Sequence, residues 1–386
     1  MATRPRRPAL GDVVLVASFL AFICLPLADG LLGLERPPRV VENRMPAPPP
    51  RLALTWPAVA ELPRELEAYW NDRFGFRRTL IRLHGLASVW LGVSPSEKVV
   101  FGKSRWLFLG DEVPWRNPHD RSPLADAQLV RWQRELEARR DWLAARSAHY
   151  LFVVVPNKAT IYPEYLPDAL APPAAPSDLH RLMVHLSARS TVDVLDLREA
   201  LRQAKTRELV YHPADTHWND RGVHTAYAAI IDRLARRFPG LTAVPSSASE
   251  TLPRRRRSGD LADMVGLREH FVHEATPLRP RDPPRARPSA TSVGGSPGRR
   301  APFASEHPDA ARPRALVFLD SFGLSLAPYL SEHFGRAVYV ARPGFDPVAV
   351  LQERPDVVIH EVVERLLKWN LQPSDLPATP PPPRPR

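Results

Sequence analysis

Continuous apolar runs alternate with amphipathic segments over most of this chain. Residues 150–155 read Tyr-Leu-Phe-Val-Val-Val, a run typical of a strand that is buried on both faces of a parallel sheet. Before it, residues 125–145 carry Leu129, Trp132 and Leu136 on one helical stripe. The same two patterns predict strands at 192–197, 209–211, 315–319, 337–341 and 357–359, and helices at 177–188, 222–238, 329–334 and near 348. Because strands alternate with helices, we expect a three-layer α/β fold, a parallel sheet with helices on both faces.

The N-terminus has the layout of an export signal. Arg4, Arg6 and Arg7 precede an apolar run from Val13 to Leu27. With the residues that follow, this run approaches the roughly 20 residues that span a bilayer. No small-x-small cleavage site is evident, so we interpret residues 1–35 as an N-terminal signal anchor that holds the body outside the cytoplasm. A cleaved signal peptide is the alternative.

Composition divides the rest of the chain. Residues 36–60 are rich in proline and predict a semi-rigid linker. Residues 61–372 follow as one α/β domain. Within it, residues 277–313 lose the helix and strand periodicity and are rich in arginine and proline, so we expect a disordered insertion there. We also expect the proline-rich tail at 373–386 to be unstructured.

The net charge is strongly positive, at +11. Thirteen arginines face seven acidic residues from Pro253 to Arg314, so over half of the surplus lies in that segment. No basic helix with interleaved aromatic residues stands out, and no nucleic-acid partner is expected. A positive field suits an anionic polymer or a membrane surface. The only cysteine, Cys24, lies in the apolar N-terminal run, so the body has neither an internal disulfide nor a cysteine-ligated metal.

An acid two residues before a histidine is the first candidate for chemistry. Asp215 and His217 lie in the turn Tyr211–Asn219, just after a short apolar run. Residues two apart on an extended backbone point to the same side. The carboxylate can therefore hold one imidazole nitrogen while the other stays available to accept a proton. The alternative is a polar turn that caps the helix expected from residue 222.

A nucleophile for this pair is expected about a hundred residues later. Ser321 follows the predicted strand at 315–319 and precedes a helix-like segment. An N-cap is the alternative for this serine. The Asp215–His217 turn and Ser321 each come after a predicted parallel strand, and the carboxyl ends of such strands converge at one edge of a sheet. The chain therefore predicts a site built in the order Asp215, His217, Ser321.

Histidines near this turn raise the question of a metal. His212, Asp215, His217 and His224 are close in sequence, but their spacing matches no tetrahedral site, and no cysteine ligand is available. We expect neither a metal nor another cofactor.

Several motifs of the chain resemble the SGNH hydrolase-like domain of AlgX/AlgJ-type alginate O-acetyltransferases. The similarity spans most of the chain outside the anchor, the insertion and the tail. It is carried by Asp-Thr-His-Trp-Asn at 215–219, Pro-Asn-Lys-Ala-Thr-Ile-Tyr-Pro-Glu-Tyr-Leu-Pro at 156–167, Asp-Ser-Phe at 320–322, Gly-Asp-Leu at 259–261, and the segments 41–44, 67–77, 106–108 and 355–365.

The resemblance implies an SGNH hydrolase-like, flavodoxin-like sheet and an exported O-acetyltransferase that acts on an alginate-like exopolysaccharide in the periplasm, anchored in the inner membrane. Ser321 would be the nucleophile, His217 the base and Asp215 its orienting partner. In the resembled systems a membrane O-acyltransferase partner delivers the acetyl donor. Leu319 departs from the SGNH pattern, which carries glycine at that position.

The expected mechanism has two halves. His217 accepts the Ser321 proton as Oγ attacks an acetyl donor, and a sugar hydroxyl then takes the acetyl group from the serine. Asn157 and Arg342, each after a predicted strand, are candidate oxyanion donors beside the backbone N–H groups near Ser321. A carbohydrate acetylesterase and a non-catalytic scaffold of a polysaccharide export complex are the alternative functions.

Overall fold

The computed structural model describes residues 10–35, 46–50, 53, 55–116, 123–173, 175–294, 300–342, 344–368, 371 and 376–377. The expected linker therefore lies partly outside the described residues, and the expected tail almost entirely so. The motif at 41–44 also lies outside them. The chain forms two compact units, Met1–Val100 with Ser258–Val272, and Phe101–Arg257 with His273–Arg386. This division differs from the single domain expected at 61–372, because the residues up to Val100 pack among themselves and with 258–272.

The first unit contains the apolar N-terminal helix α1 (Leu10–Leu32). Its stretch Leu10–Gly30 has a mean hydropathy of 2.3 over 21 residues, which is long and apolar enough to cross a membrane. A signal sequence has the same properties, so the choice between anchor and cleaved signal stays a prediction. The unit also holds α2 (Trp56–Arg73), α3 (Arg77–Trp90) and α9 (Asp260–Met264).

The second unit is built on a seven-stranded sheet that is mostly parallel, as the sequence predicts. The strand order is β4 (Asp193–Asp196), β3 (His149–Val155), β13 (Val357–Val363), β11 (Arg314–Phe318), β12 (Arg336–Val340), β10 (Phe303–Glu306) and β9 (Arg287–Ser289). The first five run parallel, while β10 and β9 are added antiparallel at one edge. All seven residues of the central strand β13 are buried, which fits its position between β3 and β11.

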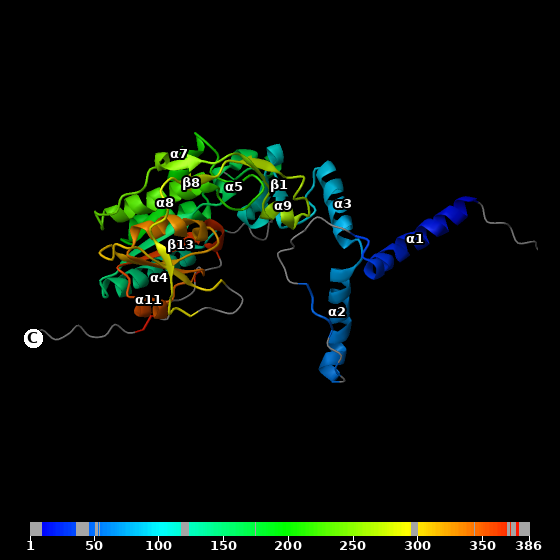
Figure 1. Ribbon diagram of the computed structural model, residues 1–386, viewed down its shortest axis with the longest axis horizontal. Coiled ribbons are helices and arrows are strands. Elements are labelled where there is room, and N and C mark those ends of the chain that lie inside the picture. The colour runs from blue at the N-terminus through cyan, green and yellow to red at the C-terminus, as the bar shows by residue number, and fades with distance from the viewer. Residues whose placement is uncertain are drawn as a thin grey trace, which may run out of the picture. The chain divides into compact units, whose positions relative to one another are not determined.

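Helices cover both faces of this sheet, and Figure 1 shows α7 and α8 on the opposite side of β13 from α4 and α11. The core on one face joins strand residues such as Phe152 and Phe318 to Trp132 of α4, Leu182 of α6 and Val350 of α11. The helix bounds are α4 (Asp126–Ala144), α5 (Lys158–Ile161), α6 (Asp178–Arg189), α7 (Arg198–Lys205), α8 (Asp220–Ala235), α10 (Ala327–Leu330) and α11 (Pro347–Glu353). Small strands lie outside the main sheet: β2 (Leu107–Leu109), β5 (Ser249–Thr251), β6 (Arg255–Arg257), β7 (His273–Ala275) and β8 (Leu278–Pro280).

Two expectations differ from the structure. Residues 277–313 were expected to be disordered, yet they carry β8, β9 and β10, and the last two extend the main sheet; only 295–299 lie outside the described part of this segment. Strand ladders are made by backbone groups, so an arginine- and proline-rich composition does not prevent edge pairing. The strand expected at 209–211 forms only an isolated bridge between Tyr211 and Trp218. The Asp215–His217 turn therefore follows a bridge and not a strand of the main sheet.

Candidate active site

The turn that carries Asp215 and His217 ends at the start of helix α8. The Asn219 side chain caps this helix by accepting the N–H groups of Arg221 at 3.0 Å and Gly222 at 3.1 Å. A Cβ at Gly222 would lie 2.2 Å from the Val210 carbonyl oxygen, so the close approach of the helix to residue 210 requires glycine there. The helix-capping role considered as the alternative for this turn thus belongs to Asn219. The side chains of Asp215 and His217 are not used for capping and are left for the site.

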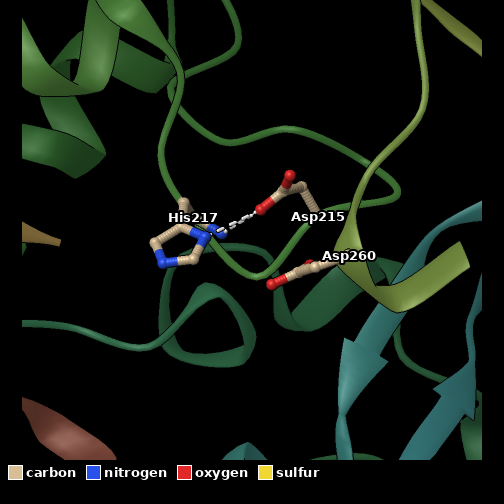
Figure 2. A group of neighbouring side chains, drawn as sticks. All are labelled: Asp215, His217 and Asp260. Carbon is tan, nitrogen blue, oxygen red and sulfur yellow. Dashed lines mark hydrogen bonds and ion pairs between the residues drawn. The ribbon is translucent and has the colours of Figure 1, made fainter. Parts of the chain in front are cut away.

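Asp215 holds the histidine through two hydrogen bonds. Its Oδ1 accepts the ring Nδ1–H of His217 at 2.8 Å and the backbone N–H of the same residue at 3.0 Å; Figure 2 shows the carboxylate directed at the ring. Burial alone would raise the pKa of Asp215, but these hydrogen bonds outweigh burial and lower it. The carboxylate therefore stays ionised and fixes the tautomer that leaves Nε2 as an acceptor.

Ser321 contacts the second nitrogen of that ring, Nε2. It follows β11, and its Oγ lies 3.0 Å from His217 Nε2, across 104 residues of sequence. The serine is exposed, whereas Phe322 is fully buried beneath the His217 ring, with centroids 4.8 Å apart. The structure thus brings together the three residues predicted from sequence in one hydrogen-bonded chain from carboxylate to hydroxyl.

A second contact joins the two turns. Trp218 Nε1–H donates to Ser325 Oγ at 2.8 Å, and Ser325 Oγ–H donates to the Phe322 carbonyl oxygen at 2.7 Å. The Trp218 ring also meets Phe322 edge to face, with centroids 5.4 Å apart. Trp218 and Phe322, the residues directly after His217 and Ser321, therefore help to hold the two turns together.

Lys158 is a site residue that sequence reasoning missed. Its side chain is fully buried, and its Nζ donates to the backbone oxygens of His212 at 3.2 Å, Pro213 at 3.2 Å and Asp215 at 2.5 Å. A lysine inside the motif at 156–167 was the available signal, but nothing local shows that its ammonium turns inward. Its bonds shape the loop that carries Asp215.

Asn157 and Arg342 lie at strand ends as expected, but each has another partner. Asn157 Oδ1 accepts the backbone N–H of Arg365 at 3.2 Å, and its own backbone N–H donates to Glu364 at 2.9 Å. The guanidinium of Arg342 forms an ion pair with Asp346. Their role as oxyanion donors stays a prediction.

The backbone around Ser321 decides which donors remain for an oxyanion. Phe322 N–H donates to Asp320 Oδ1 at 2.8 Å, so this group is already occupied. The N–H of Ser321 has no acceptor in the part of the chain that the structure describes. Leu319, where SGNH proteins carry glycine, is fully buried. The N–H of the serine itself is therefore a backbone donor available for an oxyanion.

The remaining histidines of the turn are satisfied by other groups. His212 Nδ1 lies 3.1 Å from His273 Nε2, and His224 Nε2 bonds the Val244 carbonyl oxygen at 2.9 Å. Burial and the charge of nearby Arg257 lower the pKa of His212 to about 3 and that of His273 to about 4. Both rings are neutral near pH 7. His224 thus points to a backbone oxygen instead of joining the four-residue cluster considered from sequence.

The second unit also contains a cavity of about 670 Å³. Asn157 and Arg365 line it, and the Arg365 guanidinium also lies over the Phe322 ring, 5.1 Å from its centroid. Asp215, His217 and Ser321 are not among the residues that line this cavity. Its lining includes six cationic side chains, Arg116, Arg181, Arg198, Arg202, Arg365 and Lys368, against four acidic ones.

A mostly parallel α/β sheet that carries an Asp–His–Ser hydrogen-bond chain at its loops is the arrangement of SGNH-like acyl-transfer and ester-hydrolysing proteins. Residues 99–353 match the family described as "SGNH hydrolase-like domain, acetyltransferase AlgX". The chain belongs to this family, the AlgX/AlgJ group of SGNH hydrolase-like alginate O-acetyltransferases.

Named relatives agree with this assignment. The chain is 30% identical over 166 residues to a probable alginate O-acetylase AlgJ of Pseudomonas aeruginosa, covering 43% of this chain and 40% of that protein. It is 26% identical over 178 residues to the Pseudomonas putida protein of the same name, covering 46% and 44%. The chain thus spans under half the length of these two relatives. Among solved structures, Bacillus cereus PatB1 shares the fold, with a TM-score of 0.51 at 13% identity over 70% of this chain and 96% of that one.

Proposed function

We propose that this protein is an exported, membrane-anchored O-acetyltransferase that passes acetyl groups through Ser321 to hydroxyls of an exopolysaccharide. The observation that carries the proposal is the chain of hydrogen bonds from Asp215 through His217 to an exposed serine, at 2.8 and 3.0 Å. Family membership supports acetyl transfer as the chemistry. The apolar helix α1 supports export or anchoring at the inner membrane, with the body in the periplasm.

The first half-reaction forms an acetyl-serine. Ser321 Oγ attacks the acetyl carbonyl carbon, and its proton moves to His217 Nε2, while Asp215 stabilises the imidazolium through Nδ1–H. The developing oxyanion takes the Ser321 N–H, a donor of the kind whose removal costs about 3 kcal/mol in an acyl-transfer enzyme. The imidazolium returns its proton to the leaving group of the donor. A membrane O-acyltransferase partner would supply that donor.

The second half-reaction regenerates the enzyme. A sugar hydroxyl gives its proton to His217 Nε2 and attacks the acetyl carbon, and the proton then returns to Ser321 Oγ as the ester bond to serine breaks. Family membership and the net charge of +11 support a polymer that carries carboxylates, alginate-like in this respect, as the acceptor. Water in place of the sugar would give an acetylesterase.

The test compares the parent, Ser321→Ala and Ser187→Ala with a chromogenic acetyl ester, without and with an alginate oligosaccharide. Ser187 is an exposed serine of α6 with a hydroxyl bonded to its own helix, at Val184 O, and serves as the matched control. We expect turnover and an acetylated Ser321 in the parent and the control, and neither in Ser321→Ala. Acetyl found on the oligosaccharide indicates a transferase, and acetate alone an esterase. Equal turnover in all three proteins refutes the proposal and favours the scaffold.

A further inference from the structure

Two carboxyl groups lie buried directly below the Ser321 turn. Glu361 is fully buried on the central strand β13, and its Oε2 accepts the backbone N–H of Asp320 at 3.0 Å. Asp320 in turn accepts the N–H of Phe322 through Oδ1 and that of Val363 through Oδ2, each at 2.8 Å. The pair therefore ties the residues on both sides of Ser321 to the middle of the sheet.

Asp320 and Glu361 differ in the number of hydrogen bonds that their carboxyl groups accept. Asp320 accepts two backbone N–H bonds, which suits a carboxylate. Glu361 accepts one, and its Oε1 is buried without a hydrogen-bond partner among the residues that the structure describes. Burial and the charge of Asp320 hold the pKa of Glu361 well above its usual range. Glu361 is therefore held as a neutral acid.

Packing against Glu361 also explains the glycine of the turn. A Cβ at Gly323 would lie 2.6 Å from Glu361 Oε2 and 2.6 Å from the Cβ of Leu319. The backbone at Gly323 and the carboxyl group of Glu361 thus lie so close together that a methyl group at position 323 would not fit. The 3₁₀ helix η8 (Gly323–Leu326) begins at this contact, so the height of the whole turn above the sheet depends on it.

We propose that Glu361 is a positioning residue of the acyl-transfer site, whose buried side chain accepts the Asp320 N–H, packs against Gly323 and so holds the Asp320–Gly323 turn with Ser321 Oγ 3.0 Å from His217 Nε2. Glu361 acts through Asp320 and Gly323 and does not touch the reacting atoms. This inference rests on the proposed function.

Substitutions at position 361 show whether the turn requires a hydrogen-bond acceptor there, a negative charge, or only a side chain of the same volume. Glu361→Gln keeps the acceptor for Asp320 N–H, and we expect its kcat and KM for a chromogenic acetyl ester to stay within about threefold of the parent. Glu361→Met keeps the length but loses the acceptor, so we expect kcat to fall by about 100-fold with little change in KM, as for a nucleophile displaced by about 1 Å. Gly323→Ala moves the same turn from the other side and should lower kcat in the same way.

The control is Glu353→Gln, a buried carboxylate of α11 that is paired with Arg336 at 2.9 Å. It should lower the melting temperature without lowering kcat of the folded protein. Parent-like kcat in folded Glu361→Met or, where that variant does not fold, in Gly323→Ala overturns the inference. A loss in Glu361→Gln as large as in Glu361→Met also overturns it, because the charge would then be required. Identical turnover of the parent and Ser321→Ala would instead refute the proposed function itself.

Discussion

Because the ammonium of Lys158 is buried beside the Asp215 loop, we expect its removal to lower both the stability and the activity of the protein. Three backbone oxygens of the 212–215 loop accept its hydrogen bonds, at 2.5 to 3.2 Å. Lys158→Met keeps most of the apolar stem and removes all three donors. A hydrogen bond to a charged group contributes about 1.5–3 kcal/mol net. Removing the ammonium also removes the desolvation penalty of burying its charge, so the net loss of stability is smaller than the sum of the three hydrogen bonds.

We therefore expect Lys158→Met to lose about 3–5 kcal/mol of unfolding free energy. For a unit of this size that corresponds to roughly 6–20 °C in melting temperature. The loosened loop carries Asp215, so turnover of an acetyl ester should fall by about 100-fold at a temperature where the variant is folded. Thermal unfolding by circular dichroism and ester kinetics at 25 °C measure the two effects.

Lys205→Met provides the matched control. Its ammonium donates to the Ile161 carbonyl oxygen at 2.5 Å and to Glu164 at 3.0 Å, but its side chain is 25% exposed. Water can replace those bonds, so we expect a loss of about 1 kcal/mol and unchanged turnover. A Lys158→Met protein that melts within about 2 °C of the parent and keeps its turnover would refute the role assigned to this lysine.

Two further predictions concern the contacts around the site. Trp218→Phe removes the donor to Ser325 and should cost about 1 kcal/mol; Ser325→Ala should cost the same, and additive losses in the double variant would show that the bond contributes nothing. Burial raises the pKa of Glu364 to about 7, so this carboxyl contributes stability below its unfolded pKa of about 4.3 that is lost as the pH rises through 7. Glu364→Gln should flatten the fall in stability from pH 4 to pH 8 by up to about 3 kcal/mol, and an unchanged slope in denaturant titrations would contradict this reasoning.

Part of the site is local in sequence and could be predicted from it. Asp215 and His217 are two residues apart, so the backbone geometry of one turn is enough to place carboxylate and ring together. The buried strands were predicted for a similar reason. A strand covered on both faces favours a continuous apolar run, as residues 150–155 of β3 show. The apolar helix at the N-terminus follows from the same kind of continuous pattern.

Other features depend on partners that are distant in the chain. The 3.0 Å contact between Ser321 and His217 spans 104 residues, and only the sheet brings its two ends together. Lys158 and Glu361 look like ordinary polar residues in the sequence, since nothing nearby shows that they are buried. Their roles come from the backbone groups that packing places around them.

Periodicity, continuous hydrophobicity and sequence motifs were enough to predict the fold class, the apolar N-terminal helix and the three residues of the hydrogen-bond chain. The folded chain was needed to see that the 209–211 segment stays out of the sheet, that β9 and β10 extend it, and that Glu361 packs against Gly323. This is because a residue pattern reports burial along one segment. Backbone pairing and the satisfaction of buried polar atoms depend on which segments become neighbours.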